Sequence, residues 1–231
     1  METSPMKNKF PLFCNLMEKD LGSYRKSYEK GALLLKEVPE NPMELFQKWF
    51  YEIDKYFTED ETNAMTISTL GLDGYPKSRV VLLKKYTYEG FIFYTNYNSE
   101  KGKAIDVNPN VCLSFFWHGA ERQIIIKGKA EKIAENLSDG YFESRPRGCQ
   151  LGALVSNQSD VVKDRAFLES RLLDLEKKYE GKEIERPKHW GGYIIKPIEI
   201  EFWQGRPNRL HDRIRYQLQD DYNWKINRLY P

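Results

Sequence analysis

Two cations bracket an apolar, strand-like segment in the first half of the chain. Arg79 and Lys84 flank the run Val80-Val81-Leu82-Leu83. Successive side chains of a strand point to opposite faces, so an offset of five predicts that the two cations face different ways unless a bulge intervenes. They could therefore bind two different anions. The alternative is that both are strand-end cations whose charged heads reach water.

A phenol and a guanidinium are spaced four residues apart further along the chain. On a helix, Tyr141 and Arg145 would lie on one face. Together they could hold a phosphate, because the guanidinium presents a planar fork of donors. Taken alone, this spacing favours the alternative of an ordinary surface pair.

Three cationic or potentially cationic side chains alternate near the C-terminus. If the chain is extended from Arg209, then Arg209, His211 and Arg213 share one face. Such groups repel one another unless an anion or an electron-rich ligand lies between them. The pattern therefore favours a functional site.

Common cofactor and metal motifs are absent from the sequence. No G-x-G-x-x-G follows a strand-like segment, and there is no G-x-x-x-x-G-K-[ST] loop. His118, His189 and His211 lack the spacing of metal ligands, so we expect no metal site and interpret His118 and His189 as structural or surface residues. A nucleotide-like cofactor would then be held by side chains.

Composition excludes several classes of protein. The 36 Lys and Arg residues nearly balance the 34 Asp and Glu residues, giving a formal net charge of +2, which argues against a protein that coats nucleic acid or an anionic membrane. Cys14, Cys112 and Cys149 form no C-x-x-C pair, which argues against a disulfide framework or a zinc site. No apolar run approaches the ~18 residues that a membrane span needs. We therefore expect a cytoplasmic protein.

The hydrophobic pattern predicts a mainly β fold with flanking helices. Asn41, Pro42 and Glu44 form a helix-start signal, and apolar residues recur at helical spacing as far as Phe57. Short β-rich runs then predict an antiparallel barrel, with strands at 64–70, 78–86, 91–95, 111–117, 122–134, 192–204, 213–218 and 224–229. Further helices are expected at 136–145 and 163–180.

Two parts are expected along the chain. Residues 1–40 are mixed in pattern and are predicted to form a flexible arm with a short helix at 24–35. Residues 41–231 contain no linker long enough to force a boundary, so we expect a single domain.

A series of short motifs occurs in order between Arg25 and the C-terminus. They are R-V-V-L-L-K (79–84), F-Y-T-N (93–96), E-R-Q (121–123), Y-F-x-S-R-P-R (141–147), Q-x-G-A (150–153), Q-S (158–159), W-G-G (190–192), E-F-W-Q-G (201–205), R-L-H-D-R (209–213) and the R-L-x-P ending. This ordered set resembles the pyridoxine (pyridoxamine) 5′-phosphate oxidase family. The succession of the E-F-W-Q-G and R-L-H-D-R motifs is its most specific part.

The resemblance implies a fold, a cofactor and a reaction. Members of the family are homodimers of split β-barrels that hold FMN at the subunit interface. They oxidise pyridoxine or pyridoxamine 5′-phosphate to pyridoxal 5′-phosphate, while O₂ is reduced to H₂O₂. Both FMN and the substrate carry near-dianionic phosphates, so the site must concentrate cations although the whole chain is nearly neutral.

The resemblance also implies residue roles. The residues implied to bind FMN are Arg79, Val80, Val81, Leu82, Lys84, Tyr94, Thr95, Lys101, Gln123, Gln158, Ser159, Trp203 and Arg213. Those implied to bind substrate are Arg25, Tyr28, Lys84, Tyr141, Arg145, Cys149, Arg209 and His211. Arg209 and His211 would also be catalytic, by orienting the substrate and assisting proton movement. Arg25 and Tyr28 of the arm would close the site as part of a lid.

Two positions depart from the family pattern. Glu100 stands where the family usually has Arg, next to Lys101, and this reversed charge predicts weaker FMN retention unless Lys103 compensates. Cys149 stands where the family typically has Ser, and a thiol is a weaker hydrogen-bond donor to a phosphate.

Three other functions are weighed against the oxidase. A low-turnover carrier of flavin or pyridoxal phosphate would need the phosphate-binding residues but not R-L-H-D-R. A flavin reductase of the same fold would not need Tyr141 and Arg145 as a second phosphate site. A nucleic-acid module would show a basic stripe, whereas basic and acidic residues are interleaved here.

Overall fold

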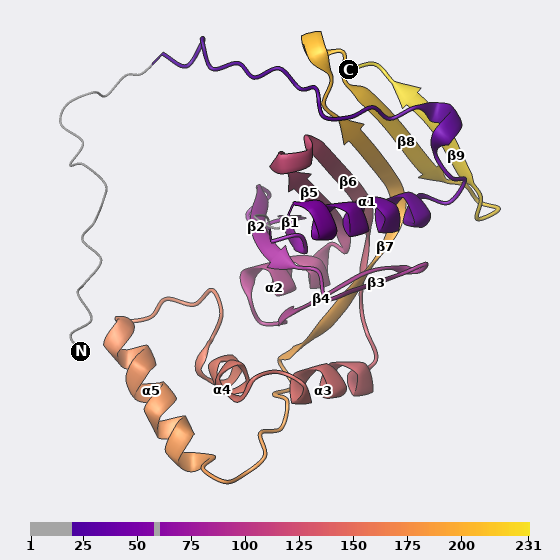
Figure 1. Cartoon of the computed structure of the whole chain (residues 1–231). Coiled ribbons are helices and arrows are strands. Elements are labelled where there is room, and N and C mark those ends of the chain that lie inside the picture. The colour runs from indigo at the N-terminus through magenta and orange to yellow at the C-terminus, as the bar shows by residue number, and fades with distance from the viewer. Residues whose placement is uncertain (1–19, 58–60) are drawn as a thin grey trace.

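One antiparallel sheet forms the centre of the molecule. The computed structural model describes residues 20–57 and 61–231, and nine strands of this part pair into that sheet (Figure 1). The strands are β1 (Ala64–Leu70), β2 (Pro76–Leu82), β3 (Lys85–Thr87), β4 (Gly90–Asn96), β5 (Asn110–Trp117), β6 (Arg122–Lys132), β7 (Trp190–Gln204), β8 (Asp212–Leu218) and β9 (Trp224–Leu229). The helices are α1 (Pro42–Tyr56), α2 (Glu100–Val107), α3 (Glu135–Glu143), α4 (Arg147–Val155) and α5 (Arg165–Lys178), with 3₁₀ turns η1 (Leu35–Glu37), η2 (His118–Ala120) and η3 (Pro207–Arg209).

Strand β7 is where the sheet divides. Its first half pairs with β4 and its second half with β8, while β6 runs along both halves. The β6–β7 register shifts between Lys127 and Gly128, opposite Pro197. Proline has no N–H to donate to the ladder, so it is tolerated at such a bulge, and the bulge bends the sheet. The sheet therefore curls into a half-barrel, which confirms the predicted mainly β fold with flanking helices.

Helix α1 packs its apolar face on the sheet. The Asn41 side chain accepts a hydrogen bond from the Met43 N–H at 2.9 Å, so the predicted helix start is confirmed. Phe46 is fully buried, and its ring centroid lies 4.8 Å from that of Phe91 on β4 and 5.4 Å from that of Phe115 on β5. This contact fixes the strands of the half-barrel around one aromatic core.

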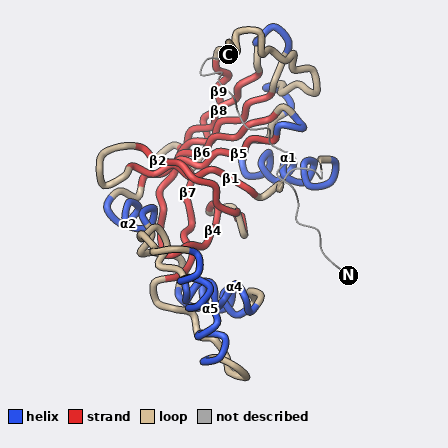
Figure 2. Tube along the Cα trace, turned by 90° about the vertical axis from the view of Figure 1, so that its left-hand side faces the viewer, coloured by secondary structure: helices blue, strands red, loops and turns tan. Residues whose placement is uncertain are grey.

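A second, smaller core holds α3, α4 and α5 at one end of the sheet. Figure 2 shows α4 and α5 together beyond the end of β4 and β7. Phe142, Leu151, Ile184 and Trp190 form its buried centre. This packing brings α3 and α4 against the start of β7, beside the end of β4.

The predicted helix at 24–35 is wrong. Apart from the turn η1, residues 20–40 are not helical. The backbone N–H groups of Glu29 and Lys30 both donate to Glu121 Oε2, at 2.8 and 3.0 Å, and that of Leu33 donates to Asp212 Oδ2 at 3.0 Å. These donors bind carboxylates of the domain instead of carbonyls one helical turn earlier. Residues 1–19 of the predicted arm lie outside the described residues.

Other boundaries also differ from the prediction. The expected strand at 78–86 is two strands, β2 and β3, because the chain leaves the ladder at Leu83 and Lys84. Helices α2 and α4 were not predicted. Both are short, and α4 contains Gly148 and Gly152, so neither has a strong helical signal of its own.

Two further expectations concern membranes and cysteines. In the described residues, no helix combines the length and apolar character that crossing a bilayer requires. Cys112 and Cys149 are free, whereas Cys14 lies outside the described part of the chain.

Candidate active site

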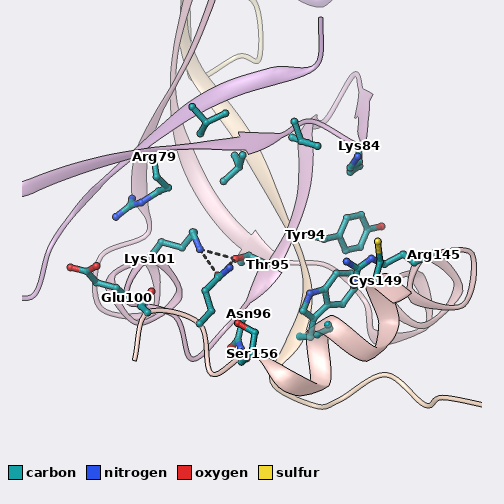
Figure 3. Close-up of a pocket in the computed structure, with 18 of the residues that line it drawn as sticks. Arg79, Lys84, Tyr94, Thr95, Asn96, Glu100, Lys101, Arg145, Cys149 and Ser156 are labelled. Atoms are coloured by element: carbon teal, nitrogen blue, oxygen red, sulfur yellow. Dashed lines mark hydrogen bonds between the residues drawn. The ribbon is translucent and has the colours of Figure 1, made fainter. Parts of the chain in front are cut away.

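A cavity of about 670 Å³ gathers many of the predicted site residues (Figure 3). It opens between β2, the end of β4, the start of α2, and α4 with the loop after it. The predicted residues that line it are Arg79, Val80, Val81, Leu82, Lys84, Tyr94, Thr95, Lys101, Tyr141, Arg145, Cys149, Gln158 and Ser159. Residues far apart in the sequence thus share one cavity.

At one end of the cavity, which we call the Lys101 end, a buried ammonium group is hydrogen-bonded to neutral oxygens. Lys101 Nζ donates to Gln158 Oε1 at 2.6 Å, Thr95 Oγ1 at 3.0 Å and Ser99 Oγ at 3.2 Å. Burial, followed by repulsion from Arg79, lowers the pKa of Lys101 to about 8, while Glu100 opposes this shift. The ammonium is therefore held where an anion would stabilise its charge.

Arg79 belongs to the same end. Its Nη1 donates to Thr69 Oγ1 at 2.8 Å and to the Ile67 carbonyl oxygen at 3.4 Å, and the residue lines the cavity. Burial lowers the pKa of Arg79, and Glu100 opposes the shift. Neither Arg79 nor Lys101 is bonded to a carboxylate of the described residues, so the two cations suit a multiply charged anion.

Glu100 is paired with Lys77, which is not among the predicted site residues. Lys77 Nζ lies 2.5 Å from Glu100 Oε2, and both residues line the cavity. Lys103, the expected compensating residue, does not line this cavity but a separate depression with Asn98 and His189. Lys77 on β2 therefore balances the negative charge of Glu100.

At the other end of the cavity, which we call the Arg145 end, aromatic rings stack on one another and a guanidinium group lies over one of them. The rings of Tyr94 and Tyr141 stack with centroids 3.9 Å apart, and the Tyr94 and Trp190 centroids are 5.5 Å apart. Arg145 lies over Trp190, with the guanidinium carbon 4.6 Å from the ring centroid. Burial raises the pKa of both tyrosines, so they remain neutral phenols that can donate hydrogen bonds.

Arg145 has an unmet hydrogen-bonding capacity. Its Nη1 is buried and has no hydrogen-bond partner among the described residues. A buried donor without a partner is costly, and an oxyanion in the cavity would satisfy it. Cys149 and Lys84 also line the cavity, on the same side as Arg145 and Tyr94 (Figure 3).

Two geometric expectations about these residues are wrong. Arg79 and Lys84 do not alternate across one strand, because β2 ends at Leu82; both line the cavity, at separate ends (Figure 3). Tyr141 and Arg145 do not share a helix, because α3 ends at Glu143, two residues before Arg145. The turn before Pro146 still brings both side chains to the cavity.

A second group of predicted residues lies outside the cavity. We name Tyr28, Trp203, Arg209 and His211 the His211 cluster. The His211 ring centroid lies 4.7 Å from that of Trp203 and 5.7 Å from that of Tyr28. The Arg206 N–H donates to His211 Nδ1 at 3.1 Å, so the neutral ring carries its proton on Nε2. Burial and the nearby Arg209 charge lower the pKa of His211, which favours this neutral form.

The expected common face of Arg209, His211 and Arg213 is not formed. Strand β8 begins only at Asp212, and Arg209 has a left-handed backbone with φ 60°. Arg213 makes a two-pronged ion pair with Glu201, at 2.7 and 3.0 Å, which relieves the predicted repulsion. Gln123, opposite Trp203 in the β6–β7 ladder, and Arg25, which is exposed, also lie outside the cavity.

Lys77 and Trp190 line the cavity but were not predicted as site residues. Strand alternation could have identified Lys77, since it lies two residues before Arg79 and shares its face. Trp190 is the first residue of the quoted W-G-G motif, but its contact with Arg145 depends on the packing of the smaller core.

Two family descriptions match this chain. "Pyridoxamine 5'-phosphate oxidase" matches residues 53–179, more than half of the chain. "Pyridoxine 5'-phosphate oxidase C-terminal dimerisation region" matches residues 190–231.

Named relatives match along nearly their whole length. A pyridoxine/pyridoxamine 5′-phosphate oxidase of Flavobacterium psychrophilum is 68% identical over 213 residues, covering 92% of this chain and all of the relative. The protein of the same name from Flavobacterium johnsoniae is 64% identical over 210 residues, covering 91% of this chain and 98% of the relative.

Known structures show the same fold. The structure of PhzG from Burkholderia lata 383, in complex with tetrahydrophenazine-1-carboxylic acid, superposes with a TM-score of 0.80 at 28% identity, covering 88% of this chain and 100% of that one. An FMN-binding protein of Nostoc punctiforme, described as related to pyridoxamine 5′-phosphate oxidase, has a TM-score of 0.63 at 13% identity, covering 80% of this chain and 96% of that one.

Proposed function

The chain belongs to the pyridoxine/pyridoxamine 5′-phosphate oxidase family, and we propose that it is itself such an oxidase, acting as a cytoplasmic homodimer. It converts pyridoxine 5′-phosphate or pyridoxamine 5′-phosphate to pyridoxal 5′-phosphate with FMN as cofactor. The substrate gives up two electrons and two protons at C4′, and O₂ takes them up to form H₂O₂. The amine substrate in addition releases ammonia when water completes the aldehyde.

One observation carries this proposal: the cavity has separate cationic ends. FMN and the substrate each bring a phosphate, so two anion sites are needed within one cavity. Arg79 and Lys101 supply one, and Arg145 with Lys84 supplies the other. A flavin reductase would not need the second site.

The residues at the Lys101 end fit the FMN phosphate. Lys101 and Arg79 provide the charge, and the side chains of Thr95, Gln158 and Ser159 provide hydrogen-bonding groups beside them. Val80, Val81 and Leu82, which lie between Arg79 and Lys84 in the sequence, also line the cavity. When bound, FMN would supply the two-electron acceptor that no protein side chain provides.

The residues at the Arg145 end fit the substrate phosphate. The free Nη1 of Arg145 and the phenol of Tyr141 are donors, and Lys84 adds charge at the rim. Cys149 takes the place of a hydroxyl donor. Its thiol contributes a weaker hydrogen bond, so the other three residues provide most of the phosphate affinity.

We propose that a second copy of the chain completes each site. In one chain the His211 cluster does not line the cavity, and neither do Gln123 and Arg213. The matched dimerisation region, residues 190–231, contains three of the four residues of that cluster: Trp203 on β7, Arg209 in η3, and His211 just before β8. Val80 and Phe116 are large apolar side chains that are 67% and 52% exposed, as residues of a subunit interface would be in an isolated chain.

Within such a dimer, Arg209 and His211 would contact the substrate ring. The neutral His211 ring donates from Nε2, so it can orient a polar group of the substrate or pass a proton at that atom. Arg209 would hold the ring with a fixed positive charge. Residues 41–231 would form the oxidase domain, and residues 1–40, including Arg25 and Tyr28, would form an arm that closes over the site.

A flavin spectrum tests this function. The purified protein is first examined for bound flavin, and pyridoxine 5′-phosphate is then added without oxygen. We expect the flavin absorbance near the visible maximum to bleach, and H₂O₂ to appear when air is admitted. A flavin spectrum that stays unchanged with either phosphate substrate would contradict the oxidase and favour the low-turnover carrier.

A further inference from the structure

An ion pair stands at the Lys101 end of the cavity. Lys77 on β2 and Glu100 at the start of α2 approach to 2.5 Å, and their side chains are 56% and 44% exposed. Lys77 and Arg79 are two residues apart on the same strand, so they share a face. Figure 3 shows Glu100 beside Arg79 and Lys101.

The position of Glu100 is fixed from two sides. Its backbone N–H donates to Ser159 Oγ at 3.2 Å, which ties the first turn of α2 to the loop that carries Gln158. Its carboxylate holds the Lys77 ammonium. The pair therefore keeps the end of a long, flexible lysine side chain at the rim of the cavity.

The charges at this end match a phosphate monoester. Lys77, Arg79 and Lys101 are three cations, and Glu100 is one anion, so the formal surplus is +2. A phosphate monoester at neutral pH carries a charge of about −1.5 to −2. Without Lys77, the surplus would fall to +1.

We propose that Lys77 binds the phosphate of FMN directly and that Glu100 is a positioning residue that orients it. This inference rests on the proposed function, because it assumes that FMN is the ligand of this cavity. It gives the departure at position 100 a specific meaning: the cation that the family pattern places on α2 is supplied here by β2. The alternative is a surface ion pair that stabilises the start of α2, where an acid is favourable by itself.

The test compares FMN with riboflavin, which lacks the phosphate. Apoprotein is titrated with each flavin, and binding is followed by flavin fluorescence. We expect Lys77→Met to weaken FMN binding about tenfold and to leave riboflavin binding unchanged, since a tenfold change in Kd corresponds to about 1.4 kcal/mol. The same substitution in a Glu100→Gln background should still weaken FMN binding at least threefold.

Lys127→Met is the matched control. Lys127 is 59% exposed and pairs with Glu199 at 2.7 Å, but it lies outside the cavity. It should change neither flavin affinity. Circular dichroism melting of each apoprotein shows whether the variants fold alike.

The outcomes separate the two proposals. If Lys77→Met leaves FMN affinity unchanged, Lys77 does not contact the phosphate. If it weakens FMN binding only while Glu100 is present, Lys77 merely neutralises Glu100. Either result overturns this inference. If the wild-type apoprotein does not prefer FMN to riboflavin, the proposed function itself fails. If the wild-type apoprotein prefers FMN, and Lys77→Met reduces that preference with and without the Glu100→Gln substitution, the result supports the proposed function and the role of Lys77.

Discussion

The Arg145 guanidinium rests on the face of the Trp190 ring, with its central carbon 4.6 Å from the ring centroid. Trp190 in turn is buried in the smaller core with Phe142, and the two ring centroids lie 5.3 Å apart. The indole thus connects the packing of α3 to the position of the cation. A guanidinium held over an aromatic face is attracted by about 0.5–2 kcal/mol, more when it is shielded from water.

Replacing Trp190 should therefore weaken substrate binding. We expect Trp190→Leu to raise KM for pyridoxine 5′-phosphate about tenfold, because Arg145 loses its platform, and to change kcat less. Steady-state kinetics measure both constants. Trp190→Phe keeps an aromatic face and should recover most of the loss; if it is no better than Trp190→Leu, the ring does not act through Arg145.

Glu121 should control the docking of the arm. This carboxylate is 2% exposed and accepts hydrogen bonds from the N–H groups of Glu29 and Lys30. Hydrogen bonds to a charged group contribute about 1.5–3 kcal/mol each. Glu121→Ala should therefore raise the amide exchange rates of Glu29 and Lys30 at least tenfold, as measured by hydrogen exchange.

Two comparisons make that measurement specific. Glu121→Gln retains an acceptor and should show a smaller effect. The amide of Leu33, which donates to Asp212, should stay protected in both variants. Equal exchange at Glu29 in wild type and Glu121→Ala would show that other contacts hold the arm.

FMN affinity should depend on pH through Lys101. Its pKa is lowered to about 8 in the folded protein, from an ordinary value of 10.5, mainly by burial. A bound phosphate would keep the ammonium charged, so binding above pH 8 requires uptake of a proton. We expect the Kd for FMN to be constant from about pH 6.5 to 7.5 and to rise between pH 8 and 9.5, by at most tenfold per unit.

The folding stability of the apoprotein should show the opposite trend. Because the charged form of Lys101 is disfavoured in the folded state, its cost to folding stability is fully present below pH 8 and disappears as pH rises towards 10.5.

The variant Lys101→Met is the control for the pH dependence of FMN binding. It should bind FMN more weakly than wild type, and its Kd for FMN should not rise above pH 8. A rise of the same size in this variant would assign the titration to another group.

The sequence predicted the elements whose signal is local. Helix α1 has a capping residue and a continuous apolar face, so its start was predicted at the observed position. The helix predicted within residues 20–40 was wrong because the N–H groups of this segment bind distant carboxylates. Lys30 pairs with Glu121, 91 residues away, and Leu33 pairs with Asp212, 179 residues away. No local pattern contains such contacts.

The site was predicted to the extent that motifs identify it. Arg79, Lys101, Tyr141 and Arg145 were identified from spacing and from family motifs, and all line the cavity. Lys77 was missed because no quoted motif includes it and because its pairing with Glu100, 23 residues away, is formed only in the fold. Motifs also do not say which copy of the chain supplies a residue. They therefore could not predict that the His211 cluster lies outside the cavity of its own chain.

Mixed dimers test that separation directly. If the cavity of one subunit uses Arg209 of the other, a dimer of one Arg145→Ala chain and one Arg209→Ala chain has one site with both defects and one intact site. Random pairing of equal amounts in a twofold dimer should then give about a quarter of wild-type activity, although each variant alone is nearly inactive. The control mixes Arg145→Ala with Tyr141→Ala, two residues of the same cavity, and should give no recovery. If the first mixture also fails to recover activity while the dimers exchange subunits, each site is built from a single chain.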